Sequence, residues 1–351
     1  MTTENDAKGV MDGPEGLVHI LPHLFGYHPE AALVLSGLTP EGALVHFART
    51  GLPTDVSDWQ ATVQDLFDFQ QGRAAEGSDT VHGLVAWICP DPADPLYGEQ
   101  SMTRHLALAG LLGVTAASHD ADLLEVVYVT RDRYWLMSTD AFGEGRPISS
   151  PPAELDATAL PRSSDVRAAL APVTGDRARA IAKAVDKVLA QADAQIRTSG
   201  HMAVANDAAA LVMRTVRDLA DGATTVEQIP DHTAARLLVG LQYSSVAGVA
   251  MELCEDRELP VARDLWLHLA RLCPDEVNWC VVEPTVLYAA TSWGLGQRGT
   301  ARLALQTVEL IVRDYYLINL LAHAMNVERS YEGFRARLRA SRASRGDSIT
   351  G

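Results

Sequence analysis

The chain has 351 residues, a hydrophobic share of 47% and a formal net charge of -16 at pH 7. That length suits two domains better than one, and the acidic balance argues against a protein that neutralises nucleic-acid phosphates. No run of about 18 apolar residues occurs, so the sequence predicts no helix that spans a membrane.

The four cysteines indicate a reducing compartment. They are Cys89, Cys254, Cys273 and Cys280, each with apolar neighbours, and none forms a chelating pair such as CxxC. This usage is typical of reduced, buried thiols in a cytoplasmic protein. Residues 1–13 are polar and lack the apolar stretch of a signal peptide, so we expect a disordered N-terminus.

Residues 14–142 carry the patterns of an α/β domain. We expect a helix from residue 14, strands at 31–38 and 43–52 joined by a turn at 39–42, a helix at 56–71, a strand at 81–90, a helix at 101–113 that ends in glycine, and two strands within 122–139. The strand at 81–90 is almost continuously apolar, which predicts burial on both faces. After the first helix the order is ββαβαββ, which favours an α+β or α/β layered domain.

The composition changes at residue 143. Residues 143–163 are rich in Pro, Gly and Ser and predict a linker. Residues 164–328 predict an all-helical domain, followed by a basic helix and tail at 329–351. The expected helices are 164–196, 202–221, 231–255, 261–273, 281–297, 299–313, 314–327 and 329–343.

Within the helical half, small residues alternate with large ones in PTVLYAATSWGLGQRGTARLALQ. Such interleaving lets helix pairs pack closely and resembles a tetratricopeptide-like unit. It covers one or two units, so a partial repeat and an ordinary bundle both stay open. The GxGxxG spacing in GLGQRGTA follows a helical pattern and not a strand, which favours a helix-turn-helix corner over a dinucleotide site.

Several stretches together resemble the actinobacterial family called domain of unknown function 4192 (DUF4192). They are LPHLFGYHPEAALVLSGL, RDRYWLMSTDAFGEGRPISSPPAEL, LWLHLARLCPDEV and EPTVLYAATSWGLGQRGTARLALQTVEL. The resemblance implies a cytoplasmic protein of high-GC Gram-positive bacteria without an established activity.

The chain departs from the family pattern at three places, so we expect a divergent member. Ala32 stands where relatives tend to have serine, no cysteine occurs between Trp135 and Gly145, and Val246-Ala247-Gly248 replaces a common Arg-Asp pair. If those groups are catalytic in relatives, this chain has lost that chemistry.

The FGYHPE stretch is interpreted as the corner between a helix and a strand. Gly26 suits the left-handed residue that ends many helices, and Pro29 holds His28 extended. His23 and His28 lack a third ligand nearby, so they do not predict a metal site. The sequence therefore assigns no catalytic residue, no metal set and no cofactor.

The loop at 90–99 carries the ligand candidates Asp91, Asp94 and Glu99. It follows an apolar strand, and ligands gather beyond the carboxyl ends of strands in α/β sheets. Three carboxylates could hold a hard cation or act as acid and base. The alternative is a solvated acidic loop that three prolines stiffen.

The C-terminal segment 329–345 holds six arginines and one acid, Glu332. It could dock on the acidic region 51–100 of the same or another subunit, touch an anionic partner, or form a solvated helix. Contact with nucleic acid would have to use its arginines, above all Arg335, Arg337, Arg339 and Arg342.

The leading expectation is a non-catalytic binding, scaffold or regulatory protein that acts through protein–protein contacts, including self-association. The alternative is an enzyme, or a protein that binds a metal or small ligand, with its site at the loop 90–99.

Overall fold

The computed structural model describes residues 14–40, 42–76, 81–140, 143–150, 159–309, 311–312, 315–327 and 330–349. The predicted disordered segment 1–13, Glu41 of the predicted turn and residues 151–158 of the predicted linker lie outside these ranges. The chain divides into two compact units, the sheet unit (Met1–Ser164) and the helical unit (Asp165–Gly351). The mixed helix and sheet content confirms an α+β protein.

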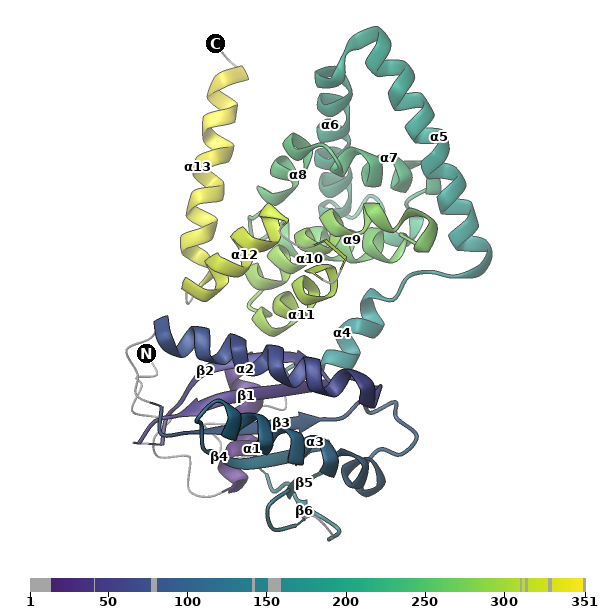
Figure 1. Ribbon diagram of the computed structural model, residues 1–351. Helices are drawn as coiled ribbons and strands as arrows, with labels where there is room; N and C mark the ends of the chain where they lie inside the picture. The colour runs from purple at the N-terminus through teal and green to yellow at the C-terminus, as the bar shows by residue number, and fades with distance from the viewer. Residues whose placement is uncertain are drawn as a thin grey trace. The chain divides into compact units, whose positions relative to one another are not determined.

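The sheet unit combines helices with the strands of one sheet (Figure 1). Its elements are α1 (Pro14–Phe25), β1 (Ala32–Leu38), β2 (Leu44–Gly51), the 3-10 turn η1 (Val56–Asp58), α2 (Trp59–Glu76), β3 (Gly83–Cys89), α3 (Glu99–Ser118), β4 (Leu123–Val129), β5 (Arg133–Leu136) and β6 (Arg146–Pro147). The predicted hairpin is confirmed, because β1 and β2 pair antiparallel.

The strands form one mixed sheet in the order β2-β1-β3-β4-β5-β6. β3 and β4 run parallel, with Ala86 opposite Val126, whereas β1 runs antiparallel to β3 and pairs Ala32 with Cys89. The start of β1 therefore lies beside the carboxyl end of β3. This topology brings the FGYHPE corner to the edge where the two parallel strands end.

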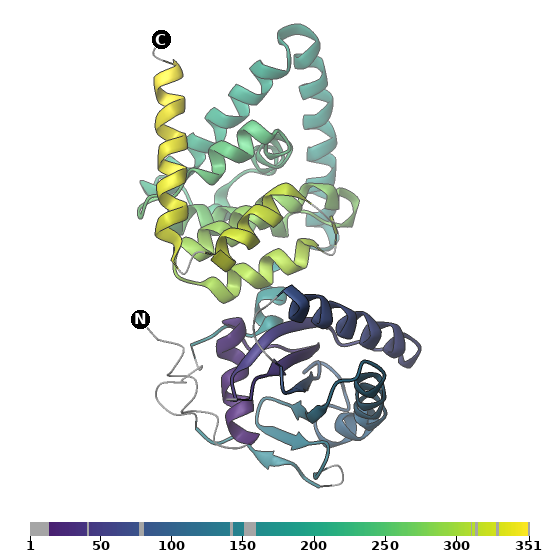
Figure 2. The same ribbon diagram turned by 60° about the vertical axis from the view of Figure 1, so that its left-hand side comes forward.

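Helices cover both faces of the sheet. α2 and α3 lie on one face and α1 on the other (Figure 2). Each face of the sheet has its own hydrophobic core, and alternate residues of β3 point into one or the other. Ile88 lies in the core under α2 and α3, and Trp87 lies in the core under α1. Every residue of β3 is buried, which confirms the predicted burial on both faces.

The predicted end of the helix at Gly113 is wrong. α3 continues to Ser118, and its apolar face continues with Leu112 and Ala116, both buried in the sheet core. A glycine inside a helix costs only about 1 kcal/mol relative to alanine. Packing of the last turn outweighs that cost.

The helical unit contains only helices and their connections among its described residues. They are α4 (Ser163–Leu170, which begins in the sheet unit), α5 (Gly175–Ser199), α6 (His201–Ala220), the 3-10 turn η3 (Val226–Gln228), α7 (Asp231–Leu241), α8 (Ser244–Met251), α9 (Leu259–Arg271), the 3-10 segment η4 (Asp275–Cys280), α10 (Val282–Gly294), α11 (Arg298–Glu309), α12 (Tyr316–Val327) and α13 (Tyr331–Ile349).

Two predicted helices are each broken in two. The helix expected at 164–196 stops after Leu170 and resumes at Gly175, because Pro172 disfavours a helical conformation in the residue before it and cannot donate a helix hydrogen bond. The helix expected at 231–255 breaks between Leu241 and Ser244 and ends at Met251.

The helices α9, α10 and α11 pack through small residues. Ala289, Ala290, Ala301 and Ala304 are all buried, and a Cβ on Gly294 would lie 2.9 Å from Leu259 Cδ2. The GxGxxG stretch is the turn between α10 and α11, as predicted. No helix in the described part of the chain is long and apolar enough to cross a membrane.

Candidate functional site

The FGYHPE stretch is the corner between α1 and β1, as predicted. α1 ends at Phe25, Gly26 has a φ of 75°, and β1 begins at Ala32. Glu30, the last residue of the stretch, is only 5% exposed. A carboxylate this deeply buried needs partners, because burial in a medium of low polarity is costly for a charge.

Glu30 finds its partners in two distant segments. Its Oε1 lies 3.1 Å from Arg131 Nε and 3.7 Å from Arg162 Nη1. Its Oε2 accepts a hydrogen bond from the backbone N–H of Ser164 at 3.0 Å. The corner therefore joins the β4–β5 connection to the start of α4, which Glu30 caps.

Backbone pairing strengthens this junction. The N–H of His28 donates to the carbonyl of Pro161 at 2.9 Å, and the N–H of Ser163 donates to the carbonyl of His28 at 3.2 Å. The N–H of Glu30 donates to Ser163 Oγ at 3.0 Å. The end of the predicted linker thus pairs with the corner as a short ladder.

The surroundings keep the Glu30 carboxylate ionised. Burial raises its pKa, but the hydrogen bonds from Ser164 and Arg131 together lower it by more. The pKa therefore lies below its ordinary value of 4.5. The corner holds a fixed negative charge that its partners compensate.

A cavity of about 480 Å³ opens beside the corner, at the carboxyl ends of β3 and β4. We call it the corner cavity. In α/β sheets this is the edge where ligands bind. Its lining includes Val18, His19, Leu21, His28, Glu30, Cys89, Tyr97, Val129, Arg131, Ile148, Leu160 and Arg162.

Two of the three candidate carboxylates of the loop 90–99 accept hydrogen bonds from the backbone of the loop itself. Asp91 Oδ1 accepts the N–H of Ala93 at 2.9 Å, and Asp94 Oδ1 accepts the N–H of Leu96 at 2.9 Å. Asp94 Oδ2 also lies 2.6 Å from Arg104 Nη2. These bonds hold the pKa of Asp94 below its ordinary range.

The third candidate, Glu99, is the exposed first residue of α3. Asp91 and Asp94 line a second cavity of about 410 Å³ together with Arg104 and His105, and Glu99 does not line it. Across the described residues no set of three acidic, histidine or cysteine side chains could hold a metal ion. The structure thus brings two of the three candidates together.

His105 gives this second cavity a group that the sequence did not single out. The residue is 2% exposed, its ring stacks on Trp59, and its Nδ1 lies 2.7 Å from the carbonyl of Ser101. Since a carbonyl only accepts, Nδ1 carries the proton. Burial lowers the pKa of His105, which favours the neutral ring.

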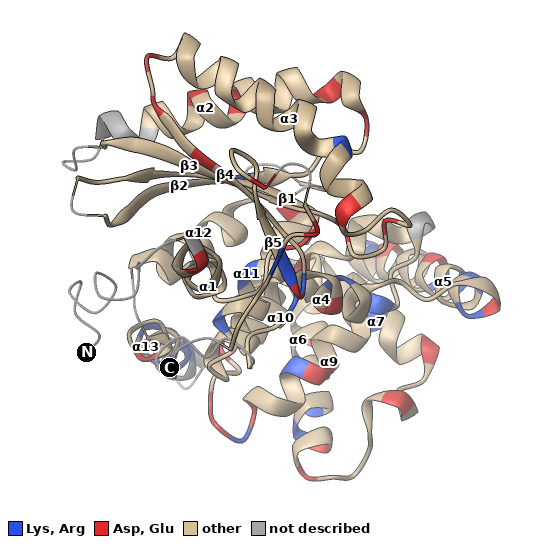
Figure 3. Cartoon of the chain, turned by 90° about the horizontal axis from the view of Figure 1, so that it is seen from below, with Lys and Arg blue, Asp and Glu red and all other residues tan. Residues whose placement is uncertain are grey.

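The basic tail is an ion-paired helix. α2 carries the acidic residues Asp65 and Asp68 (Figure 3). The arginines of α13, however, pair with carboxylates of the helical unit itself, in the segment 252–258 (ELCEDRE). The pairs are Arg335 with Asp256, Arg339 with Glu255, Arg342 with Glu258 and Arg345 with Glu252. We call these four pairs the arginine ladder.

The ladder accounts for most of the arginines considered for nucleic-acid contact. Arg339 is bidentate on Glu255, with distances of 2.8 and 2.6 Å. Arg342 binds Glu258 in the same way, at 3.0 Å for both bonds. The Arg337 guanidinium lies 5.6 Å from the centre of the Phe334 ring.

The residues around the corner were missed as site residues, although both segments were recognised as motifs. Glu30 directly precedes an apolar strand, and Arg131 lies in the RDRYW stretch. An acidic residue at the mouth of a buried strand is a usable signal, because such a charge requires a partner. Nothing in the sequence points to Arg162 as that partner.

Comparison with known proteins gives one family. The family model described as Domain of unknown function (DUF4192) matches residues 14–328. Neither the curated proteins nor the solved structures contain a match to the chain.

Proposed function

Because the chain belongs to the DUF4192 family, whose description assigns no activity, we propose a function from its surfaces. The protein is a non-catalytic binding protein, a scaffold or regulatory subunit that works through protein–protein contacts of its helical unit.

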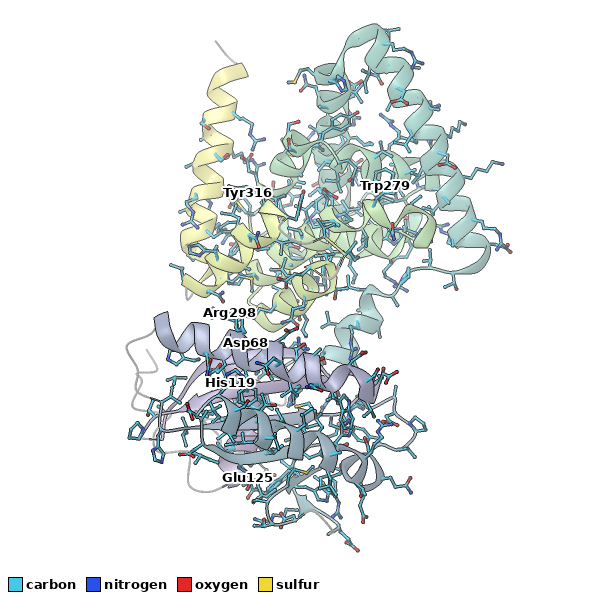
Figure 4. All side chains as sticks on the ribbon, viewed as in Figure 1. Asp68, His119, Glu125, Trp279, Arg298 and Tyr316 are labelled. Atoms are coloured by element: carbon cyan, nitrogen blue, oxygen red, sulfur yellow. The ribbon has the colours of Figure 1, made fainter. Side chains whose placement is uncertain are left out.

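One face of α12 carries this proposal. Tyr316 is 71% exposed, Leu320 39% and Val327 66% (Figure 4 labels Tyr316). Intervals of four and seven residues place these side chains on one side of a helix. Apolar side chains that gather on a surface mark sites of interaction.

The packing of α9 to α12 supports a tetratricopeptide-like arrangement of this unit. α10 packs against both α9 and α11, and α11 packs against α12. Consecutive helices thus pack on each other, as they do within a helical repeat, and α10 also contacts α8, α12 and α13. Such arrays commonly present extended binding surfaces.

The cysteines support a cytoplasmic, non-catalytic protein. All four are buried and unpaired, and burial raises the pKa of Cys89 and of Cys273 to about 12. A thiol in that state is a poor nucleophile, because the thiolate is the reactive form. Unpaired thiols are also usual in reducing compartments.

A pull-down of the tagged full chain from native lysate tests the proposal. We expect a stoichiometric partner, or self-association in light scattering, that the double variant Tyr316→Ser/Leu320→Ser loses. Val114→Ser is the matched control, since Val114 on α3 is also 71% exposed. A partner that both variants retain, or steady turnover of a substrate, would count against a binding role of α12.

The second cavity favours one alternative function. Asp91 and Asp94 line it with His105, a neutral imidazole of fixed tautomer. An enzyme or ligand-binding site at the loop 90–99 is therefore the second candidate. A thermal-shift screen with Mg²⁺, Mn²⁺, Ca²⁺ and nucleotides tests it, since a ligand at 100 times its Kd stabilises by about 2.7 kcal/mol. A shift that Asp91→Asn/Asp94→Asn abolishes would favour this candidate.

A further inference from the structure

Beyond the protein contacts proposed above, we propose that the corner cavity binds a small organic oxyanion, a molecule with a carboxylate or phosphate head and an apolar body. The inference rests on the arginines, the charge and the walls of this cavity.

Arg162 supplies the principal binding group. Its side chain is 32% exposed and lines the cavity, and its nearest acidic partner, Glu30 Oε1, lies 3.7 Å away. The guanidinium donates no hydrogen bond to the residues that the structure describes. A guanidinium has five N–H donors in a planar fork that matches a carboxylate or a phosphate.

The junction with Glu30 does not explain Arg162. Glu30 already has Arg131 at 3.1 Å and the N–H of Ser164 at 3.0 Å. One cation and one backbone donor are enough to compensate one buried carboxylate. The positive charge of Arg162 is therefore not needed to compensate Glu30.

The charge of the lining favours an anion. With its histidines counted as neutral, the lining carries one net positive charge, from Arg131 and Arg162 against Glu30. The chain as a whole carries -16. Glu15 lies outside the lining, and its Oε1 accepts the N–H of Ser149 at 2.9 Å. A positive cavity in an acidic protein concentrates small anions.

The walls fit a ligand with an apolar body. The Tyr97 hydroxyl accepts the N–H of Arg131 at 2.7 Å, and its own proton has no acceptor among the described residues, so it can donate to the ligand. The volume of about 480 Å³ lies in the range of small-molecule sites. The apolar wall includes Val18, Leu21, Pro22, Val129, Ile148 and Leu160.

Calorimetric titration of the full chain at low salt tests the proposal. The probes are benzoate, phenyl phosphate, inorganic phosphate and, as a cation of similar size, benzylamine. We expect saturable binding of benzoate or phenyl phosphate, weaker binding of inorganic phosphate, and none of benzylamine. The comparison of benzoate with phenyl phosphate identifies the head group.

Variants assign the binding to this cavity. Arg162→Gln should weaken binding roughly 10-fold or more, as expected for the loss of a bidentate charged contact. Arg146→Gln is the matched control, because Arg146 is partly exposed, pairs with Asp140 and does not line the cavity. Circular dichroism checks that each variant is folded. If Arg162→Gln does not fold, Tyr97→Phe is the second test of the cavity.

Three results would overturn the proposal: no saturable binding of either aromatic anion, equal binding of benzylamine, or affinity that both cavity variants leave unchanged. The double variant Tyr316→Ser/Leu320→Ser should bind the anion normally. Failure of this inference is thus separate from failure of the protein-contact proposal.

Discussion

The carboxylate of Glu30 accepts a hydrogen bond from the backbone N–H of Ser164, 134 positions later in the chain. This bond joins the first corner of the sheet unit to the first turn of α4. Because the FGYHPE and RDRYW stretches also meet there through Arg131, two of the motifs that resemble the DUF4192 family come together at one place.

We predict that Glu30→Ala destabilises this junction. The change leaves the Ser164 N–H without its acceptor and Arg131 without its buried partner. The loss of a hydrogen bond to a charged group costs about 2 kcal/mol. Hydrogen exchange at the Ser164 amide measures this destabilisation, and the amide should exchange faster in the variant. Asp176→Asn, at an almost fully exposed ion pair with Arg179, should leave that amide unchanged.

The contribution of Glu30 should depend on pH. Its pKa in the folded chain is lowered from 4.5, because the bonds from Ser164 and Arg131 outweigh the opposing effect of burial. The unfolded chain therefore takes up this proton first as the pH falls. The stability that Glu30 provides is complete above its unfolded pKa and is lost as the pH falls through the folded pKa.

The difference in unfolding free energy between wild type and Glu30→Gln measures this effect. It should be constant near neutral pH and shrink below 4.5 in urea titrations at successive pH values. Other carboxylates titrate in both proteins and cancel in the difference. A difference that stays constant down to acid denaturation would contradict the assigned role.

We predict that salt loosens the far part of α13. Its beginning packs through Tyr331 and Phe334 against Trp293, whereas its later turns carry three of the four pairs of the arginine ladder. The pairs of Arg339 and Arg342 are partly exposed on both sides, and exposed ion pairs contribute about 0.2–1 kcal/mol each and are screened by salt. Hydrogen exchange over residues 336–345 should accelerate in roughly 0.5 M NaCl.

Two internal references accompany this measurement. The first turn of α13 and the buried helix α10 should exchange equally at low and high salt. Arg339→Gln should reproduce part of the acceleration at low salt. Uniform exchange along α13 at all salt concentrations would mean that apolar packing, and not the ladder, holds the helix.

We predict that Gly113→Ala stabilises the protein. Gly113 lies inside α3, and a Cβ there meets open space. Alanine in a helix interior is better than glycine by about 0.5–1 kcal/mol. Gly296→Ala is the counterpart, because Gly296 has a φ of 79° in equally open space and should cost about 1 kcal/mol. Thermal denaturation of both variants tests the opposite signs.

Local patterns were enough to place most elements of the sheet unit. The apolar run of β3 predicted burial on both faces, and the proline and glycine around His28 predicted the corner. These features depend on residues close in sequence. The helix boundaries were less predictable. Packing carries α3 past Gly113, and the helix expected at 231–255 breaks after Leu241.

The sequence by itself determined the elements, the acidic surface and the buried thiols, since periodicity and composition act over a few residues. Only the tertiary structure decided which charged side chains pair with one another. Arg131 is 101 positions from Glu30 and Ser164 is 134. Arg131 comes close because it follows β4, which runs parallel to β3, and the end of β3 pairs with the start of β1. In the same way, the arginines of α13 pair with the segment 252–258, because the fold brings those carboxylates within reach.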